Sequence, residues 1–327
     1  MSSVSTKSLP KIELHAHLNG SISLKTMQKL HNQNDGSEED LKSLILNEPK
    51  TMDEVFKYFG LIHKLIQTKE ALLTATMDVI REFNEDGVVY LELGTTPKKV
   101  GDMTKFDYIM TIHEALELSS DLPIVVRFIL TIDRRQSVEE ASEIVALAEQ
   151  FAKKYGKVVG IGLAGDPSCD GQKFLPVLRQ ARHRGLKISI HLAELKNCLD
   201  EVDAMLQFGP DRIAHGSFLH LEDRWVHQIA KQKIPFEICL TSNILCMTNS
   251  CYAESHFSFW KNLDVPVVLC TDDKGLMDIT LSGELQIAAK EFNLSEEDLK
   301  KMTRDAFNSR FLAENDPLYA NIFELIK

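Results

Sequence analysis

Cysteine is scarce in this sequence and follows no regular spacing. Six cysteines occur among the 327 residues, at positions 169, 198, 239, 246, 251 and 270. Cys239 and Cys270 lie inside apolar runs, where reduced cysteine behaves as a small hydrophobic residue. The pair Cys246 and Cys251 has no second pair nearby that would complete a structural zinc site. These features indicate a reduced chain, and we expect it in the cytosol.

Long apolar runs and an excess of positive charge are also missing. No stretch of about 18 uncharged apolar residues is present, so a transmembrane helix is not expected. The first residues, MSSVSTKSLPK, lack an apolar segment that could serve as a signal peptide. The net charge of −11 argues against an extended face for nucleic acid. We expect a monomer that binds a small molecule, with neither a membrane nor a nucleic-acid polymer as partner.

Short runs rich in β-branched residues recur along the chain, and most are followed by residues with helical periodicity. Several runs, such as VVGIGL and PVVLC, are apolar throughout, as expected of parallel strands covered on both faces. Helices are predicted at 138–153, 172–184 and 200–208. This alternation predicts a (β/α)8 TIM barrel, with a flavodoxin-like open sheet as the alternative. The predicted strands cover residues 12–18, 88–95, 125–132, 158–163, 187–192, 212–215, 235–240 and 266–270.

A long insertion, residues 21–87, separates the first two predicted strands. It contains a polar stretch, NQNDGSEED, and two predicted helices at 51–65 and 71–83. Two interpretations are open: the insertion is a surface excursion of the barrel, or it forms a cap over the open mouth. Because no low-complexity linker interrupts the chain, residues 1–327 are expected to form one domain.

Polar residues stand at the C-terminal ends of predicted strands, where barrel enzymes carry their chemistry. His15 and His17 are two residues apart on the first strand and therefore point to the same face. Alone, they could equally be a chance pair of histidines. His191 at the end of the fifth strand and Asp272 after the eighth complete a set of nitrogen and oxygen ligands that suits Zn²⁺. We expect one zinc ion per chain.

Three further polar residues stand beside the predicted ligands. Glu194 follows His191 by three residues and is placed to move a proton, which a catalytic zinc site requires. His215, in RIAHG, is placed to stabilise the attacking hydroxide. The alternatives are a solvated loop glutamate and a buried structural histidine. Asp273 points away from its neighbour Asp272, so it could hydrogen-bond to a ring nitrogen of a substrate.

Two other kinds of metal site are excluded by missing residues. The pattern His-x-Glu followed by Pro-Cys-x-x-Cys, which holds zinc in nucleobase deaminases, does not occur. A dinuclear hydrolase would need a bridging lysine at the fourth strand, which instead runs into Gly165, Asp166 and Pro167. A single metal ion is favoured.

Four motifs occur in the order KIELHAHLNGS, HLAE, RIAHG and LCTDD. With them the chain resembles the adenosine deaminase family of metal-dependent hydrolases over nearly its whole length. Asn19 stands where adenosine deaminase proper has aspartate. Together with TTPKK, LTSN and TDDKG it is most similar to the adenosine deaminase-like branch, the N6-methyl-AMP deaminases. The resemblance implies hydrolysis of N6-methyl-AMP to IMP and methylamine, by attack of zinc-bound hydroxide on purine carbon 6.

The resemblance also implies a role for each residue of the site. Glu194 would be the proton donor, His215 would assist the hydroxide, and Asp273 would act with Gly165 at the purine ring. The chain departs from the family at Gly94, usually arginine, and Gly162, usually aspartate. We expect that an arginine–aspartate pair on neighbouring strands was lost as a unit. Zinc would be held by His15, His17, His191 and Asp272, and the other substrate contacts would come from His17, Asn19, His63, Thr95, Thr96, Pro97, Lys98 and Asp133.

Cations at the barrel rim bear on whether the substrate carries a phosphate. They could bind a phosphate or merely solvate the rim. A triphosphate is not expected because no P-loop is present. His63 and Lys64, in the insertion, could close over the same end. The cations and neighbouring hydroxyls that follow the second and third predicted strands are Lys98, Lys99, Arg134, Arg135, Thr95 and Thr96.

Three functional interpretations follow. The first is a zinc deaminase of a 6-substituted purine nucleoside monophosphate. The second is an adenosine deaminase that acts on the free nucleoside. The third belongs to another class: a barrel that binds nucleosides or a protein partner with little catalysis, suggested by Gly94 and Gly162.

Overall fold

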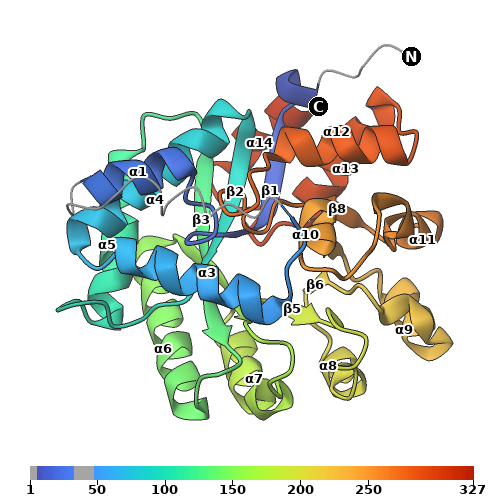
Figure 1. Cartoon of the computed structure of the whole chain (residues 1–327), viewed down its shortest axis with the longest axis horizontal. Helices are drawn as coiled ribbons and strands as arrows, with labels where there is room; N and C mark the ends of the chain where they lie inside the picture. The colour runs from blue at the N-terminus through green and yellow to red at the C-terminus, as the bar shows by residue number, and fades with distance from the viewer. Residues whose placement is uncertain (1–5, 33–47) are drawn as a thin grey trace.

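Eight parallel strands pair in chain order in the computed structural model, which describes residues 6–32 and 48–327. Ala16 on the first strand bridges to Asp272, just beyond the eighth, so the last strand returns to the first. The strands are β1 (Lys11–His17), β2 (Val88–Thr95), β3 (Val125–Asp133), β4 (Val158–Ala164), β5 (Lys187–Leu192), β6 (Arg212–His215), β7 (Phe236–Ile238) and β8 (Val267–Leu269). Helices surround them (Figure 1). The predicted (β/α)8 TIM barrel is confirmed, and the open sheet is excluded.

The observed strands begin and end within two residues of the predicted ones. β2, β5 and β6 begin and end where predicted. β7 ends two residues earlier than predicted, because the chain turns into helix α10 at Leu240. The alternation of apolar runs with helical segments therefore predicted where the strands lie. The last residue of each strand depends on the turn that follows it.

Helix ends follow from their capping residues. α6 (Val138–Tyr155) begins after a capping box between Ser137 and Glu140 and ends at Gly156, whose φ of 66° is left-handed. The predicted helix at 172–184 is a 3-10 turn, Gln172–Phe174, followed by α7 (Leu175–His183). The other described helices are α1 (Leu24–Asn32), α3 (Met52–Leu65), α4 (Lys69–Glu85), α5 (Lys105–Leu118), α8 (Val202–Phe208), α9 (Asp223–Gln232), α10 (Leu240–Leu245), α11 (Phe257–Asn262), α12 (Leu281–Glu291), α13 (Glu296–Ser309) and α14 (Tyr319–Ile326).

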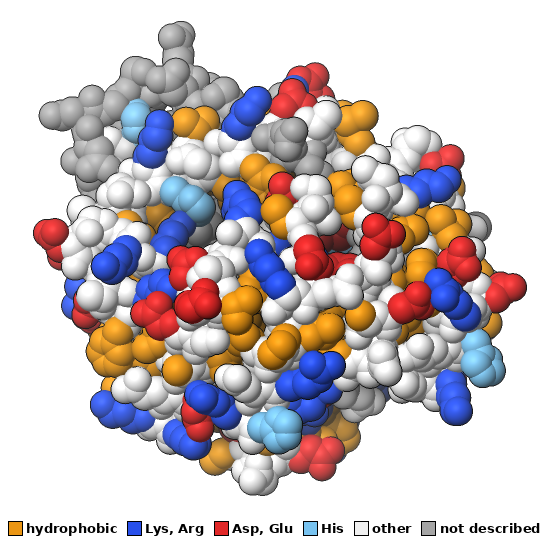
Figure 2. Space-filling view, turned by 90° about the horizontal axis from the view of Figure 1, so that it is seen from below, with side chains coloured by type: hydrophobic (Ala, Val, Ile, Leu, Met, Phe, Trp, Pro, Cys, Tyr) orange, Lys and Arg blue, Asp and Glu red, His pale blue; other side chains and the backbone are white. Residues whose placement is uncertain are grey.

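The core lies between the strands and the surrounding helices. Ile161 and Leu163 of β4 are fully buried and belong to one apolar cluster with Ile144 of α6. In the described ranges, no helix combines the length and the hydrophobicity that a membrane crossing requires. Acidic and basic side chains are interspersed over the face shown in Figure 2.

The insertion between β1 and β2 forms α1, α3 and α4. The polar stretch NQNDGSEED begins at the last residue of α1, and the rest of it lies outside the described residues. α3 crosses in front of the strands in Figure 1, and its residues Val55, Phe56, Phe59 and His63 line the same cavity as the strand ends. The predicted helices at 51–65 and 71–83 correspond to α3 and α4.

Candidate functional site

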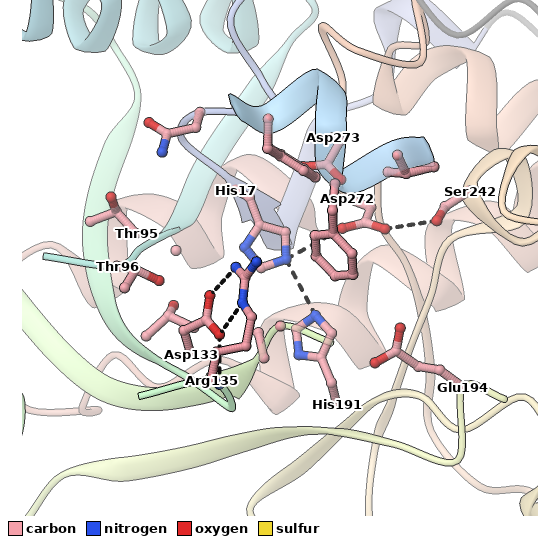
Figure 3. Close-up of a pocket in the computed structure, with 18 of the residues that line it drawn as sticks. His17, Thr95, Thr96, Asp133, Arg135, His191, Glu194, Ser242, Asp272 and Asp273 are labelled. Atoms are coloured by element: carbon pink, nitrogen blue, oxygen red, sulfur yellow. Dashed lines mark hydrogen bonds and ion pairs between the residues drawn. The ribbon is translucent and has the colours of Figure 1, made fainter. Parts of the chain in front are cut away.

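A cavity of about 540 Å³ opens at the C-terminal ends of the strands. Its lining includes His17 and His191 on one part of the wall and Lys98 on another. In Figure 3, Thr95, Thr96, Asp133 and Arg135 lie on one side of His17, and Glu194 and Ser242 lie on the other. The cavity thus has a metal end, around His17, His191 and Asp272, and a cationic end, around Thr95, Lys98 and Arg135.

At the metal end, the predicted ligand atoms converge. His17 Nε2 lies 3.3 Å from His191 Nε2 and 3.3 Å from Asp272 Oδ1, and His15 Nε2 lies 3.4 Å from that same oxygen. A tetrahedral ion with ligands at 2.0–2.1 Å separates them from one another by about 3.3–3.4 Å. These three spacings fit a four-coordinate metal site.

A fifth donor, His215, stands slightly farther away. One donor atom from each of His15, His191, His215 and Asp272 lies within 4.8 Å of the others, so His215 could also belong to a ligand set. Its Nε2 is 3.8 Å from Asp272 Oδ2, longer than the separations that His17 makes. Geometry favours His17 as the ligand, with His215 beside the site.

The electronic state of the ligands also suits a metal ion. Burial first, and then the neighbouring His15, lower the pKa of His17 to about 4 and bring the pKa of His191 well below its usual value. His191 Nδ1 donates to the carbonyl of Leu163, so its Nε2 presents a lone pair. His15 Nε2 is buried and has no hydrogen-bond partner among the described residues. The lowered pKa values of His17 and His191 favour the neutral rings that can donate a lone pair to a metal ion. At His15, by contrast, burial is outweighed by the hydrogen bonds and charges of Asp272 and Glu237, which raise its pKa.

Two of the predicted ligands, His15 and Asp272, are held by residues that were not predicted to belong to the site. His15 Nδ1 donates to Glu237 Oε2 at 2.7 Å, and Ser242 Oγ donates to Asp272 Oδ2 at 2.7 Å. Burial raises the pKa of Glu237, but Arg212 and His15 outweigh it and hold that pKa at about 2. A carboxylate in this position fixes the tautomer of a metal-binding histidine. The sequence carried a signal for Glu237: a single acid inside the apolar run PFEICL.

Glu194 and His215 meet beside the ligands. Both are buried, and His215 Nε2 is 3.8 Å from Glu194 Oε2. Burial raises the pKa of Glu194, while His215 and Arg134 lower it. Glu194 Oε1 has no hydrogen-bond partner among the described residues and lines the cavity. This arrangement suits a carboxyl group that exchanges a proton with a ligand.

Asp273 lies against a glycine that makes room for it. A Cβ at Gly20 would be 1.7 Å from Asp273 Oδ1, so only glycine permits this approach. Burial, and then the neighbouring charge of Asp272, raise the pKa of Asp273 well above its usual value. A protonated carboxyl group at this position can donate to a ring nitrogen. Gly165 also lines the cavity, with a φ of 97°.

At the cationic end, Lys98 lines the cavity and is half-buried. Burial lowers its pKa to about 8. Thr95 and Thr96 line the same end, although the Thr95 hydroxyl also bonds to Tyr108 at 2.7 Å. Pro97 is buried but does not belong to the lining. Lys98 is the cation best placed for an anionic ligand.

Three of the other cations have different surroundings from those expected. Arg134 is buried and donates to Glu201 and to the carbonyl of His191, so it holds the barrel together behind the site. Lys64 and Lys99 are exposed and do not belong to the lining. Of the two interpretations of the rim cations, contact with a phosphate is therefore not supported by the positions of Arg134 and Lys99. Such partners could not be read from the sequence, because Glu201 is far from Arg134 along the chain.

Arg135, Asp133, Asn19 and His63 do reach the cavity. Arg135 Nε donates to Asp133 Oδ1 at 2.8 Å, so its charge is already paired. Asn19 Nδ2 donates to His63 Nε2 at 2.9 Å and thereby joins the end of β1 to α3. Burial, followed by the charges of Lys98 and Arg135, lowers the pKa of His63 to about 4, which keeps that ring able to accept.

Known proteins share this architecture. The model of the adenosine deaminase family matches residues 10–324. The chain belongs to the adenosine deaminase family. It is 41% identical over 320 residues to a Danio rerio protein named N6-methyl-AMP deaminase, covering 94% of this chain and 92% of that protein.

Solved structures agree with this family membership. An Arabidopsis N6-mAMP deaminase is similar with a TM-score of 0.89 and 36% identity, over 98% of both chains. An Arabidopsis ADAL structure complexed with IMP has a TM-score of 0.89 and 35% identity, over 98% of this chain and 97% of that one.

The two departures from the adenosine deaminase family lie together behind the metal end. Gly94 on β2 and Gly162 on β4 flank Thr131 of β3, so the strands that carry them are not neighbours, contrary to the sequence-based expectation. A Cβ at Gly94 would lie 3.4 Å from His17 Nδ1, and one at Gly162 would lie 3.2 Å from Thr131 Oγ1. Both glycines line a cavity of about 20 Å³ below the predicted ligands.

Proposed function

We propose that this chain is a zinc-dependent deaminase that hydrolyses N6-methyl-AMP to IMP and methylamine. The observation that carries this proposal is the cavity itself, whose lining includes His17, His191 and Asp272 at one end and Thr95, Lys98 and Arg135 at the other. The names of the Danio rerio and Arabidopsis relatives support the same substrate. The IMP bound to the Arabidopsis ADAL structure supports a nucleotide product.

We propose that His15, His17, His191 and Asp272 hold one zinc ion. The three mutual distances of 3.3–3.4 Å and the mixture of nitrogen and oxygen donors support zinc over a harder ion. When bound there, zinc would lower the pKa of a water molecule and so supply the nucleophile for purine carbon 6.

The remaining polar residues of the metal end handle protons and orientation. Glu194 is the proposed proton donor to a purine ring nitrogen, since its carboxyl group is buried and its Oε1 is free to face a ligand. Asp273, whose pKa is raised by burial and by Asp272, is proposed to donate to a second ring nitrogen beside Gly165. His215 stabilises the attacking oxygen from its place between Glu194 and Asp272. The C6–N6 bond then breaks, and the amine departs with a proton.

The cationic end is proposed to bind the 5′-phosphate. Lys98 would form a charge-assisted contact with it, and Thr95, Thr96 and Asn19 would add polar contacts. His63 on α3 would place the insertion over the bound nucleotide, which favours the cap interpretation over a surface excursion. In the alternative interpretation, an adenosine deaminase, the substrate would carry no phosphate for Lys98 to contact, and Asp133 would be the acidic group whose charge acts on it.

Three broader properties belong to the same proposal. Residues 1–327 would form one domain, in which α3 caps the barrel mouth. All six cysteines are free, which supports a reducing compartment such as the cytosol. Size-exclusion chromatography with light scattering would test the expected monomer.

The test of the proposed function is a product assay with the zinc-loaded protein. AMP, N6-methyl-AMP and adenosine are supplied at equal concentrations, and IMP or inosine is measured together with methylamine or ammonia. Preferred turnover of N6-methyl-AMP, with methylamine and IMP in equal amounts, supports the proposal. Preferred turnover of adenosine supports the nucleoside interpretation, and tight binding without turnover supports a non-catalytic barrel.

A further inference from the structure

Residues at the strand ends of the site adopt left-handed backbone conformations. Ala193, His215 and Asp272 have φ values of 53°, 56° and 59°, and Gly216 has 65°. For residues other than glycine this conformation is strained and persists only where neighbouring contacts hold it. The contacts made by these residues therefore help to aim the side chains of the site.

The carbonyl group of His215 is held differently from those of the other two. The Ala193 carbonyl accepts from the backbone N–H of Phe218 at 3.2 Å, and the Asp272 carbonyl accepts from that of His17 at 2.9 Å. The His215 carbonyl accepts from a side chain, His256 Nε2, at 2.7 Å. A substitution of His256 can therefore remove the contact at His215, whereas the carbonyls of Ala193 and Asp272 accept from backbone N–H groups that this substitution leaves in place.

His256 is built into the protein as a fixed donor. Its side chain is buried just before α11, parallel to the ring of His220 and edge-on to Phe236. Because a carbonyl oxygen only accepts, Nε2 must carry the hydrogen. Nδ1 has no hydrogen-bond partner among the described residues. Burial lowers the pKa of His256 to about 3, so the ring stays neutral and its tautomer does not change.

The turn that follows His215 has little room to move. A Cβ at Gly216 would lie 2.2 Å from the Phe236 ring, which also packs beside His256. Phe236 therefore limits the turn from one side, and the His256 hydrogen bond holds it from the other. The imidazole of His215 is then directed at Glu194 and Asp272, at 3.8 Å from each.

We propose that His256 is a positioning residue: its Nε2–H holds the left-handed turn at His215 and so aims the His215 imidazole at the reaction centre. This inference rests on the proposed function of His215. It predicts that loss of the hydrogen bond lowers kcat while zinc and substrate are still bound, because the hydrogen bond of His256 is to the His215 carbonyl and its ring contacts are with His220 and Phe236.

Substitution of His256 by glutamine or asparagine tests whether the hydrogen bond to the His215 carbonyl matters or whether any polar side chain at this position is enough. In His256→Gln the amide nitrogen reaches the place of Nε2, whereas in His256→Asn it is shorter and reaches only the place of Nδ1. His220→Gln is the matched control, because His220 stacks on His256 but does not bond to His215. Zinc content, the melting temperature, kcat and KM for N6-methyl-AMP are measured for all four proteins.

The expected result is a kcat for His256→Asn lower by about 10- to 100-fold, the effect of misplacing a catalytic group by about 1 Å. KM and zinc content should stay at wild-type values. His256→Gln and His220→Gln should retain most of kcat. Equal kcat in the Asn variant and wild type would overturn the proposal, as would equal losses in the Asn and Gln variants. If the Asn variant does not fold, the Gln variant decides: near-wild-type kcat supports the proposal, and a collapse with zinc retained contradicts it.

Crystal structures of the wild type and both His256 variants give a second measurement that is independent of turnover. The φ of residue 215 should stay positive in the Gln variant and relax in the Asn variant, with a displaced ring. An unchanged His215 in the Asn variant would overturn the proposal. If the wild type does not deaminate N6-methyl-AMP, the proposed function fails, and these structures still test the role of His256.

Discussion

At the metal end of the cavity, His15, His191 and Asp272 are buried and each is held by a partner outside the ligand set. At the cationic end, Lys98 and Arg135 are more exposed, and Arg135 is already paired with Asp133. One end is rigid before any ligand arrives. At the cationic end, the contribution of the Lys98 charge to binding depends on whether the ligand carries a negative charge.

This contrast suggests that the metal end carries out the reaction and the cationic end determines which substrate is preferred. Side chains locked by several hydrogen bonds keep ligand geometry within the small tolerance that a metal site needs. A half-buried lysine with a pKa lowered to about 8 gains most from an anion, since burial disfavours its charged form. Substitutions at the metal end should therefore abolish the reaction, and substitutions at the cationic end should change which substrate is preferred.

The largest effect is expected from Asp272→Ala. Removal of this ligand leaves three donors, so zinc should be lost and kcat/KM should fall by at least about 10³-fold. Metal analysis after dialysis, together with the deamination assay, measures both. Ser242→Ala is the control, because it removes the hydrogen bond to Asp272 and a long contact with Cys246 Sγ but leaves all four ligands, and it should retain zinc. Full zinc occupancy in Asp272→Ala would contradict the ligand assignment.

Glu194→Gln should separate binding from catalysis. The amide keeps the shape of the side chain but cannot deliver a proton, a step worth about 10²–10⁴-fold. Zinc content and the Kd for IMP should remain at wild-type values while kcat collapses. If the variant keeps more than about a tenth of the wild-type kcat, another residue supplies the proton.

Glu237→Gln should weaken zinc binding at the metal end less than Asp272→Ala does. The amide can still bond to His15 but is neutral, so zinc affinity should fall by about 10- to 100-fold. Competition with a chelator measures this affinity. Ser189→Ala is a milder comparison, because Ser189 donates to Glu237 without touching the ligand. Equal zinc affinities in Glu237→Gln and wild type would show that the charge of Glu237 does not support His15.

The smallest effect concerns pH at the cationic end. Lys98 is positive below its pKa of about 8 and neutral above it, so phosphate binding should weaken as pH rises through about 8. The phosphate monoester stays doubly charged there, since its second pKa is about 6. kcat/KM for N6-methyl-AMP should fall above about pH 8 in the wild type and remain level in Lys98→Arg. The same fall in both proteins would assign the titration to another group.

The fold was predictable because its signals are local. Apolar β-branched runs located all eight strands, and residues such as Ser137 and Gly156 marked the ends of α6. The early end of β7 was not predicted, because the run PFEICL continues past the point where the chain enters α10. An apolar run indicates that its residues are buried, and residues can remain buried after the strand has ended, as Cys239 and Leu240 do.

The site was only partly predictable, for a related reason. His15, His17, His191 and Asp272 stand at strand ends, and the barrel brings strand ends together. The partners of the rim cations depend on contacts between distant segments: Arg134 meets Glu201, and His256 meets the carbonyl of His215. No local pattern encodes those pairs.

The central claim is that one cavity joins metal-assisted deamination to recognition of a 5′-phosphate. The most direct test is kcat/KM of the wild type and Lys98→Ala on N6-methyl-AMP and on N6-methyladenosine, with Lys99→Ala as the matched exposed-lysine control. Lys98→Ala should lower the nucleotide reaction by about 10- to 100-fold, the worth of a charge-assisted contact, and leave the nucleoside reaction unchanged. Equal losses on both substrates, or a wild-type preference for the nucleoside, would contradict the account.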